Sequence, residues 1–292
     1  MNQNVPINQL LYSTLRIEAQ LPNGISVGTG FIVLYEREDE KYLFIVTNKH
    51  VINGAFFGKF FFTESDDNGN PLIGQRFDVN IADFDKIWFF HPGGMDIAIF
   101  PLIPVLQQIE NENHKVYFRS IPLSLIPTEK EEESLTALEE TIFIGYPNAI
   151  YDTKNLLPII RKGTTATPVF IDYEGKPLFL IDASVFKGSS GSPVFIYNYG
   201  SYSTSERNVM IGYRVHFIGV VSEVLINANM GKIEFLEIPT TQIPAVKMEQ
   251  FLNLGVVIKA RVIVETIEEF LRTKEEVNKW VTLQSLTSSR QH

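Results

Sequence analysis

The sequence contains no cysteine among its 292 residues. This absence excludes disulfide bonds, thiolate nucleophiles and zinc–thiolate sites, and it fits a reducing compartment. Clusters of basic residues are missing as well, and the formal net charge is −9. Because binding to nucleic acid needs a clustered basic surface, we do not expect a nucleic-acid partner.

Long apolar runs are also absent. No stretch reaches the roughly 18 apolar residues of a membrane span, and residues 1–6 lack the basic and apolar regions of a secretory signal. We therefore expect a cytoplasmic protein without a membrane partner. Hydrophobic residues make up 45% of the chain and charged residues 20%, which is typical of a globular protein with a sizeable core.

Short strands separated by polar turns fill residues 1–127. Two of them, 15–20 and 25–35, flank a Pro22-Asn23-Gly24 turn and predict a hairpin. Strands at this spacing indicate a sandwich or a barrel. The further strands expected in this part are 42–46, 58–62, 76–80, 86–90 and 96–100.

A linker helix is predicted over residues 128–140, because Thr128 followed by Glu131 fits a capping box. Strands resume in a second domain, residues 141–265, and the last of them is expected over 255–264. From Thr266 the apolar period becomes helical. We predict a terminal helix over 266–284 and a frayed tail over 285–292.

The segment Gly188-Ser189-Ser190-Gly191 is a candidate catalytic turn. Gly188 permits a tight turn and leaves its N–H uncovered, while Gly191 removes a side chain that would crowd the serine. The Ser190 hydroxyl is then presented on a bend, with the N–H groups of Gly188 and Ser190 directed at one point. This is the arrangement of a nucleophile beside an oxyanion site. The alternative is a small-residue turn between two strands.

A serine nucleophile needs a general base and a carboxylate. His50 ends the most apolar strand of the first half, and Asp96 directly precedes an alternating apolar strand. A buried carboxylate there would need a hydrogen-bond donor such as a histidine, although Asp96 as a simple turn cap is the alternative. Weaker competitors are Asp83 and Asp85, and the histidines interpreted as structural or exposed are His91, His114, His216 and His292.

With these residues in the order His50, Asp96, Ser190, the chain resembles the trypsin-like (chymotrypsin-fold) serine proteases in their bacterial, cysteine-free form. Flanking segments resemble the motifs of that family in the same order along the chain. They are Gly28–Val33, Thr47–Val51, Asp96–Ala98, Gly145–Pro147, Gly219–Ser222 and Gly255–Ala260.

The resemblance implies an all-β fold of two antiparallel six-stranded Greek-key β-barrels with a C-terminal helix. The first barrel would carry His50 and Asp96, and the second Ser190 and the oxyanion hole of the Gly188 and Ser190 amides. It further implies hydrolysis of protein or peptide substrates through an acyl-enzyme, without metal or cofactor. Ser190 would be the nucleophile, His50 the base and then the acid, and Asp96 the residue that orients it.

The resemblance also places a substrate site. Ser184 would lie at the base of the primary specificity pocket, Val221, Ser222 and Glu223 along one wall, and Gly255 on another. The insertion 225–254 would border this site as a lid or a partner surface. Ser189 stands where the animal digestive members carry an aspartate, so we expect no N-terminal zymogen switch of their kind.

Two other functions are compatible with the same residues. One is a double-barrel scaffold that is silent, or that a regulatory protein partner must activate. The other is an esterase that uses the same three residues. The intact trio favours an endopeptidase, because a pure scaffold has no physical reason to keep it.

Overall fold

A computed structural model describes residues 7–147, 151–186, 188–204, 208–228 and 249–288. The strands are β1 (Thr14–Leu21), β2 (Gly24–Arg37), β3 (Glu40–Thr47), β4 (Phe57–Ser65), β5 (Pro71–Ala82), β6 (Phe89–Phe90), β7 (Ala98–Pro101), β8 (Val116–Tyr117), β9 (Ile121–Pro122), β10 (Glu140–Gly145), β11 (Ile159–Thr165), β12 (Leu178–Asp182), β13 (Pro193–Ser203), β14 (Val209–Ala228) and β15 (Glu249–Lys259). The α-helices are α1 (Ile7–Leu10), α2 (Lys49–Ile52), α3 (Ile103–Asn111), α4 (Glu129–Glu133) and α5 (Arg261–Ser288). Tighter 3₁₀ turns are η1 (Leu11–Ser13), η2 (Phe84–Ile87), η3 (Leu123–Leu125) and η5 (Tyr173–Gly175).

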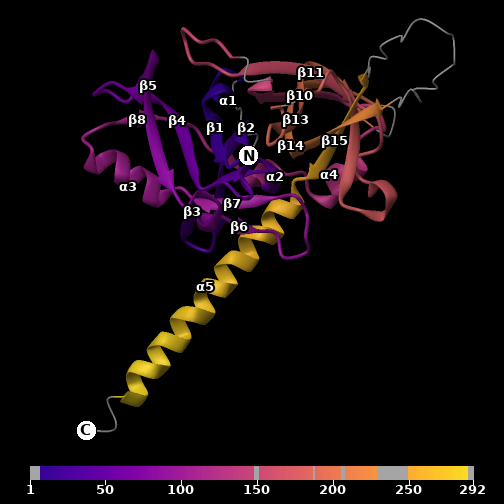
Figure 1. Cartoon of the computed structure of the whole chain (residues 1–292). Coiled ribbons are helices and arrows are strands. Elements are labelled where there is room, and N and C mark those ends of the chain that lie inside the picture. The colour runs from indigo at the N-terminus through magenta and orange to yellow at the C-terminus, as the bar shows by residue number, and fades with distance from the viewer. Residues whose placement is uncertain (1–6, 148–150, 187, 205–207, 229–248, 289–292) are drawn as a thin grey trace, which may run out of the picture.

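The chain is mostly β and forms two sheets (Figure 1). The first sheet has the strand order β5-β4-β1-β2-β3-β7-β6, with β8 paired to β4 and β9 paired to β2. The predicted hairpin is present as β1 and β2, which pair from Leu21 and Gly24 outward. In the described residues this sheet has nine strands and not the six expected. Three of the nine, β6, β8 and β9, are only two residues long.

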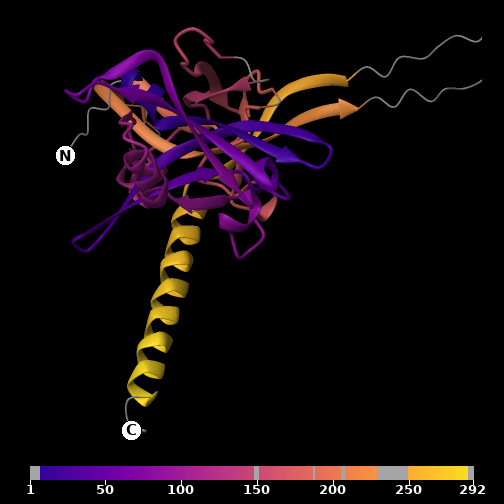
Figure 2. The ribbon, with the colours of Figure 1, turned by 60° about the vertical axis from the view of Figure 1, so that its left-hand side comes forward.

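The second sheet runs in the closed order β10-β11-β12-β15-β14-β13. Its longest strands, β14 and β15, pair from Gly219 with Lys259 out to Ala228 with Glu249, so that they project from the body (Figure 2). The two ends of the predicted 225–254 insertion therefore extend this hairpin. Residues 229–248 of the insertion lie outside the described residues.

Four predicted elements differ from the structure. The strand expected over 86–90 is the turn η2 followed by β6, because the chain bends there to bury Phe84 against Gly58, where an added Cβ would lie 2.2 Å from the Phe84 ring. The linker helix is capped at Thr128 as predicted, yet it ends at Glu133. The buried Leu135 draws the following segment into the core.

The last predicted strand, 255–264, ends five residues early at Lys259, and the helix that was expected from Thr266 begins at Arg261. The N–H of Ala260 still donates to Ile218 of β14, and the N–H of Ile263 then donates to Ala260, which starts the helical turn. Helical geometry buries Val262 and Ile263 completely. A strand would turn one of two adjacent residues outward.

The two sheets share a hydrophobic core that joins the halves of the molecule. Phe31 of β2 meets Phe217 of β14 edge to face, with ring centroids 5.6 Å apart, and Phe195 of β13 lies 5.5 Å from Phe217. Each sheet also has an apolar cluster of its own. The shared cluster fixes the sheets against each other, so residues from both can meet at their junction.

The helix α5 begins at this junction and then runs away from the body (Figure 1). Phe270 packs edge to face against Phe44 of β3 and Phe89 of β6, with centroids 5.6 and 5.5 Å away. The Tyr35 hydroxyl donates to Glu268 over 3.2 Å. Within the described part of the chain, no helix combines the length and the apolar character of a membrane span.

Candidate active site

His50 lies on α2, a single helical turn that follows β3 directly. The turn is closed by the Asn53 N–H, which donates to the Lys49 carbonyl over 2.9 Å. The His50 side chain is 49% exposed. A short helix at the end of a buried strand thus holds an imidazole at the surface between the two sheets.

Asp96 stands two residues before β7 and is paired with His50 by two contacts. The His50 backbone N–H donates to Asp96 Oδ1 over 2.9 Å, and His50 Nδ1 lies 2.6 Å from Asp96 Oδ2. Asn48 also holds Asp96 in place, because its Nδ2 donates to the Asp96 carbonyl over 2.8 Å. His50 follows β3 and Asp96 precedes β7, and these two strands pair with each other.

The carboxylate determines the state of the imidazole. Burial alone would raise the pKa of Asp96, but hydrogen bonds from His50 and Ser222 and the attraction of the His50 ring hold that pKa below its ordinary value. Asp96 is therefore ionised at neutral pH and accepts hydrogen bonds only. His50 Nδ1 carries the proton, so Nε2 is left as the basic nitrogen.

Ser190 lies on the loop between β12 and β13, at the junction of the sheets. The carbonyl of Ser190 accepts from the Thr29 N–H over 3.0 Å, and the Gly191 N–H donates to the Val221 carbonyl over 2.8 Å. Gly191 has φ +84°, and an added Cβ there would lie 1.9 Å from the Thr29 carbonyl oxygen. The glycine after the serine is thus required by space as well as by backbone conformation.

Ser222 links the serine to the histidine–aspartate pair. The Ser190 hydroxyl donates to the Ser222 carbonyl over 3.1 Å, while the Ser222 hydroxyl donates to Asp96 Oδ2 over 2.8 Å. One residue of β14 therefore contacts both Ser190 and Asp96, although these lie on different sheets. The structure brings His50, Asp96 and Ser190 to one place.

The backbone of the serine loop leaves two donors open. Gly188 has φ +87°, and the Ser189 N–H donates to the Phe186 carbonyl over 2.9 Å. Among the described residues, the N–H groups of Gly188 and Ser190 have no hydrogen-bond acceptor. Lys187 lies outside the described residues.

The predicted substrate residues have different surroundings. Val221 is 1% exposed and packs in the core of the second sheet, with its N–H donating to Ser192 and its carbonyl accepting from Gly191. It supports the serine loop, and its place along a pocket wall stays a prediction. Ser222 is 5% exposed and turns its hydroxyl to Asp96.

Ser184 is half-buried next to the serine loop. Gly255 lies close to Val185, whose Cγ2 would be 2.7 Å from an added Cβ. Gly255 pairs with Ile181 of β12 and Val224 of β14. The Glu223 side chain lies outside the described residues.

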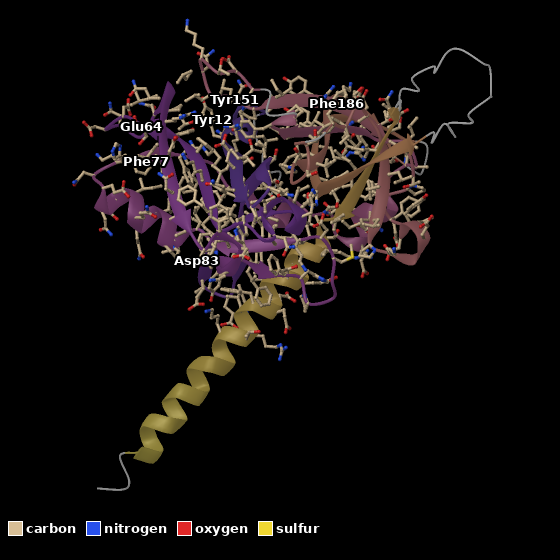
Figure 3. All side chains as sticks on the ribbon, viewed as in Figure 1. Tyr12, Glu64, Phe77, Asp83, Tyr151 and Phe186 are labelled. Atoms are coloured by element: carbon tan, nitrogen blue, oxygen red, sulfur yellow. The ribbon has the colours of Figure 1, made fainter. Side chains whose placement is uncertain are left out.

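The other histidines have partners elsewhere. His91 Nδ1 accepts from the N–H groups of Gly93 and Met95, over 3.0 and 3.3 Å, and so shapes the turn before Asp96. His114 lies 2.9 Å from Glu64, and its ring contacts the Phe77 ring, with centroids 4.3 Å apart. Glu64 and Phe77 lie in the half of the molecule away from Phe186 (Figure 3).

Among the remaining candidates, His216 is half-buried in β14, and His292 lies outside the described residues. Of the competing acids, Asp83 pairs with Lys86 at 2.7 Å, and Asp85 lies on η2. In the described part of the chain, no group of three or more acidic or histidine side chains is placed to hold a metal ion.

Sequence reasoning missed three residues that contact the candidate site through their side chains: Thr29, Asn48 and Ser222, the last considered only for substrate binding. Asn48 adjoins His50, and an amide at a helix start is a recognisable signal. Ser222 and Thr29 act across 126 and 159 residues of sequence, respectively, so that no local pattern connects them with Asp96 or Gly188.

Comparison with known proteins shows the family of the chain. The model of the trypsin-like peptidase domain family matches residues 28–201, more than half of the chain. A comparison with curated proteins gives no match.

Solved structures of proteases resemble the chain at low identity. The serine endoprotease from Yersinia pestis has 14% identity and a TM-score of 0.46, covering 92% of this chain and 68% of its own. The Rv3671c protease from M. tuberculosis in its active form has 14% identity and a TM-score of 0.41, covering 90% and 82%. The family model, which matches residues 28–201, carries the assignment: the chain belongs to the trypsin-like serine peptidases.

Proposed function

We propose that this protein is a serine endopeptidase in which Ser190, His50 and Asp96 form a catalytic triad. The observation that carries the proposal is the bridge through Ser222, which contacts both Ser190 and the carboxylate that holds His50. Members of a peptidase family act on proteins or peptides, and we infer a substrate of that class. Closure of the first sheet into a Greek-key barrel and a cytoplasmic location remain predictions.

The reaction follows from the protonation states. The Ser190 hydroxyl rotates about its Cα–Cβ bond from the Ser222 carbonyl toward His50 Nε2, a change between staggered rotamers. As its oxygen bonds to the peptide carbonyl carbon, its proton passes to Nε2, and the Asp96 carboxylate stabilises the imidazolium. The imidazolium then protonates the leaving amine, and a water molecule releases the acyl group by the same steps.

The negative charge that develops on the carbonyl oxygen needs donors that are already in place. The N–H groups of Gly188 and Ser190 serve as these donors in the proposal, because no described residue accepts from either. Donors that need no reorganisation supply the largest single part of such catalysis. Ser184, Val221, Ser222, Glu223 and Gly255 are retained as proposed substrate contacts.

Covalent labelling with a fluorophosphonate tests the proposal. We expect a single adduct on Ser190, lost in Ser190→Ala and strongly slowed in His50→Ala. Ser201→Ala, which removes an exposed serine from the strand that follows the nucleophile, serves as the matched control and should label normally. An adduct on another residue, or no adduct under any condition, would contradict the proposal.

Partner activation is the second candidate function, because the resting Ser190 hydroxyl donates to Ser222. The two candidates differ in the same assay. An endopeptidase labels as the isolated chain, whereas a partner-activated protein labels only after the partner has been added. Parallel assays with peptide and ester substrates separate an endopeptidase from an esterase.

A further inference from the structure

Thr29 lies at the centre of β2, completely buried, and contacts the serine loop from the opposite sheet. Its backbone N–H donates to the Ser190 carbonyl over 3.0 Å. Its hydroxyl donates to the Gly188 carbonyl over 3.2 Å. One residue of the first sheet thus holds the carbonyls of both residues whose amides form the proposed oxyanion hole.

The direction of the hydroxyl bond is fixed by its neighbours. The Tyr146 N–H donates to Thr29 Oγ1 over 3.0 Å, and the Ser192 hydroxyl donates to the same oxygen over 3.4 Å. A hydroxyl has one proton to donate, and a backbone N–H cannot accept it. The Thr29 proton is therefore committed to the Gly188 carbonyl.

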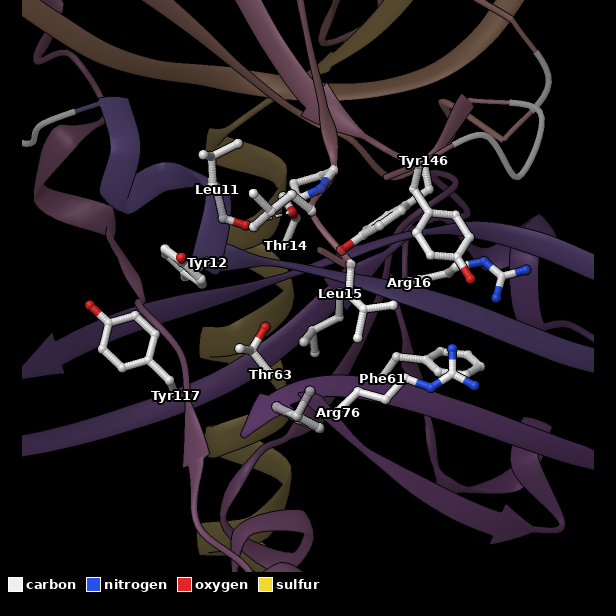
Figure 4. A pocket seen from close by; sticks show the side chains of 15 residues that line it. Leu11, Tyr12, Thr14, Leu15, Arg16, Phe61, Thr63, Arg76, Tyr117 and Tyr146 are labelled. Atoms are coloured by element: carbon white, nitrogen blue, oxygen red, sulfur yellow. Dashed lines mark hydrogen bonds between the residues drawn. The ribbon is translucent and has the colours of Figure 1, made fainter. Parts of the chain in front are cut away.

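Tyr146 is itself held firmly. Its side chain is buried in the pocket between the first sheet and the segment that follows β10 (Figure 4), and its hydroxyl is hydrogen-bonded to Thr14. Gly145 beside it has no room for a side chain, because an added Cβ would lie 2.5 Å from Thr29 Oγ1. The start of the second sheet therefore fixes the Thr29 hydroxyl in position.

The contacts immobilise one peptide unit of the serine loop at both ends. In the peptide between Gly188 and Ser189, the carbonyl accepts from Thr29, and the N–H donates to the Phe186 carbonyl over 2.9 Å. The two oxyanion donors are the N–H groups of the peptide units before and after this one. Fixing the central unit fixes the angle between them.

We propose that Thr29 is a positioning residue for the oxyanion hole, acting through the Gly188–Ser189 peptide; this rests on the function proposed above. Without the hydroxyl proton, the Gly188 carbonyl loses its donor and the peptide gains freedom to rotate. The Gly188 N–H then no longer points at the developing oxyanion. Loss of the Thr29 hydroxyl should therefore weaken the stabilisation of the transition state and leave substrate binding unchanged.

The test uses Thr29→Val, which keeps the shape and removes the hydroxyl. Deleting an oxyanion donor outright costs on the order of 10²–10³-fold in kcat, and we expect about 10–100-fold for this indirect change, with KM unaltered. Thr29→Ser retains a donor and should recover most of the activity. Thr29→Cys has a weaker donor of similar size and gives a milder variant with intermediate kcat should Thr29→Val not fold.

Thr165→Val is the matched control. Thr165 is another buried threonine, whose hydroxyl donates to Ala137 over 2.8 Å and accepts from the Glu139 N–H, in contacts that do not include the serine loop. It should lower the melting temperature as Thr29→Val does and leave kcat unchanged. After phosphonylation of Ser190, the ³¹P resonance should move in Thr29→Val only, because the phosphoryl oxygen occupies the oxyanion hole.

The outcomes separate this assignment from the function on which it rests. A wild-type kcat and ³¹P shift in folded Thr29→Val would overturn the positioning role alone. Equal losses in the Thr29 and Thr165 variants would reduce Thr29 to a structural residue. If the wild-type Ser190 is never labelled, the proposed function fails and the positioning role falls with it.

Discussion

The Ser222 hydroxyl donates to Asp96 Oδ2 across the junction of the two sheets, over 2.8 Å. The same carboxylate oxygen lies 2.6 Å from His50 Nδ1. Asp96 is thus held by donors from both halves of the molecule. The position of the histidine depends on how the sheets are docked as well as on its own short helix.

Ser222→Ala should therefore reduce turnover without unfolding the protein. Removing one donor to an ionised carboxylate costs about 1.5–3 kcal/mol, and we expect kcat to fall about tenfold because Asp96 then orients His50 less firmly. Ser13→Ala is the control, since it removes another buried serine hydroxyl, which donates to Leu10 over 2.8 Å and not to Asp96. Unchanged kcat in Ser222→Ala would show that the Ser222 hydroxyl is not needed to position the carboxylate.

Asp96 should also contribute to the pH dependence of stability. Its pKa is held below the ordinary value in the folded state, so the folded protein binds the proton less readily than the unfolded chain does. The stabilisation is complete above the ordinary aspartate pKa and is lost as the pH falls through the lowered value. Asp96→Asn lacks this contribution.

Urea unfolding of the wild type and Asp96→Asn across that pH range measures the effect. The difference in their unfolding free energies should shrink as the solution becomes more acidic. A difference that stays constant through the whole range would contradict the lowered pKa. At neutral pH the same variant should lose on the order of 10⁴-fold in kcat, by analogy with the corresponding change in trypsin, while Asp85→Asn should not.

His91 should matter because of the turn that it organises. Its Nδ1 accepts two backbone N–H groups in the segment that leads to Asp96, and His91→Leu leaves both without that acceptor. We expect a loss of about 1–3 kcal/mol in unfolding free energy, together with a lower kcat. His114→Leu, at the histidine paired with Glu64, should affect stability only. If His91→Leu and His114→Leu had the same kcat, the turn before Asp96 would have no effect on catalysis.

The ion pair of Arg214 and Glu139 tests how the linker is held to the second sheet. Both side chains are buried, 7% and 4% exposed, and they are hydrogen-bonded to each other. Breaking a buried pair costs about 3–5 kcal/mol, so Glu139→Gln should be strongly destabilising in thermal unfolding. The adjacent Glu140, paired with Lys162, is exposed, and Glu140→Gln should cost no more than about 1 kcal/mol. A similar loss of unfolding free energy in Glu139→Gln and Glu140→Gln would contradict the burial of the Arg214–Glu139 pair.

Local chemistry explains what could be predicted from the sequence. The Pro22-Asn23-Gly24 turn and the Thr128 cap depend on residues a few positions apart, and both are present. The start of α5 could not be predicted, because Gly255–Val264 is apolar apart from Lys259 and Arg261 and suits a buried strand as well as a buried helix. Only the shared core, which receives Val262 and Ile263, decides between them.

In the candidate site, too, some residues have a local sequence signal and others depend on long-range packing. His50, Asp96 and Ser190 could be proposed from the sequence because each is a chemically distinctive residue beside an apolar strand. The packing of Val221 in the core depends on the pairing of β14 with β15, which no local sequence pattern defines. Thr29 contacts Gly188 only because two sheets pack together, and a threonine between glycines carries no sign of that contact.

Trapping an acyl-enzyme tests the central claim most directly. A peptide ester that acylates quickly is mixed with the protein and quenched in acid, and the mass of the intact chain and of its peptides is measured. The account predicts a mass increase equal to the acyl group on Ser190, absent in Ser190→Ala, together with hydrolysis of peptide substrates by the wild type only. Peptide hydrolysis that survives in Ser190→Ala, or an acyl group on any other residue, would contradict it.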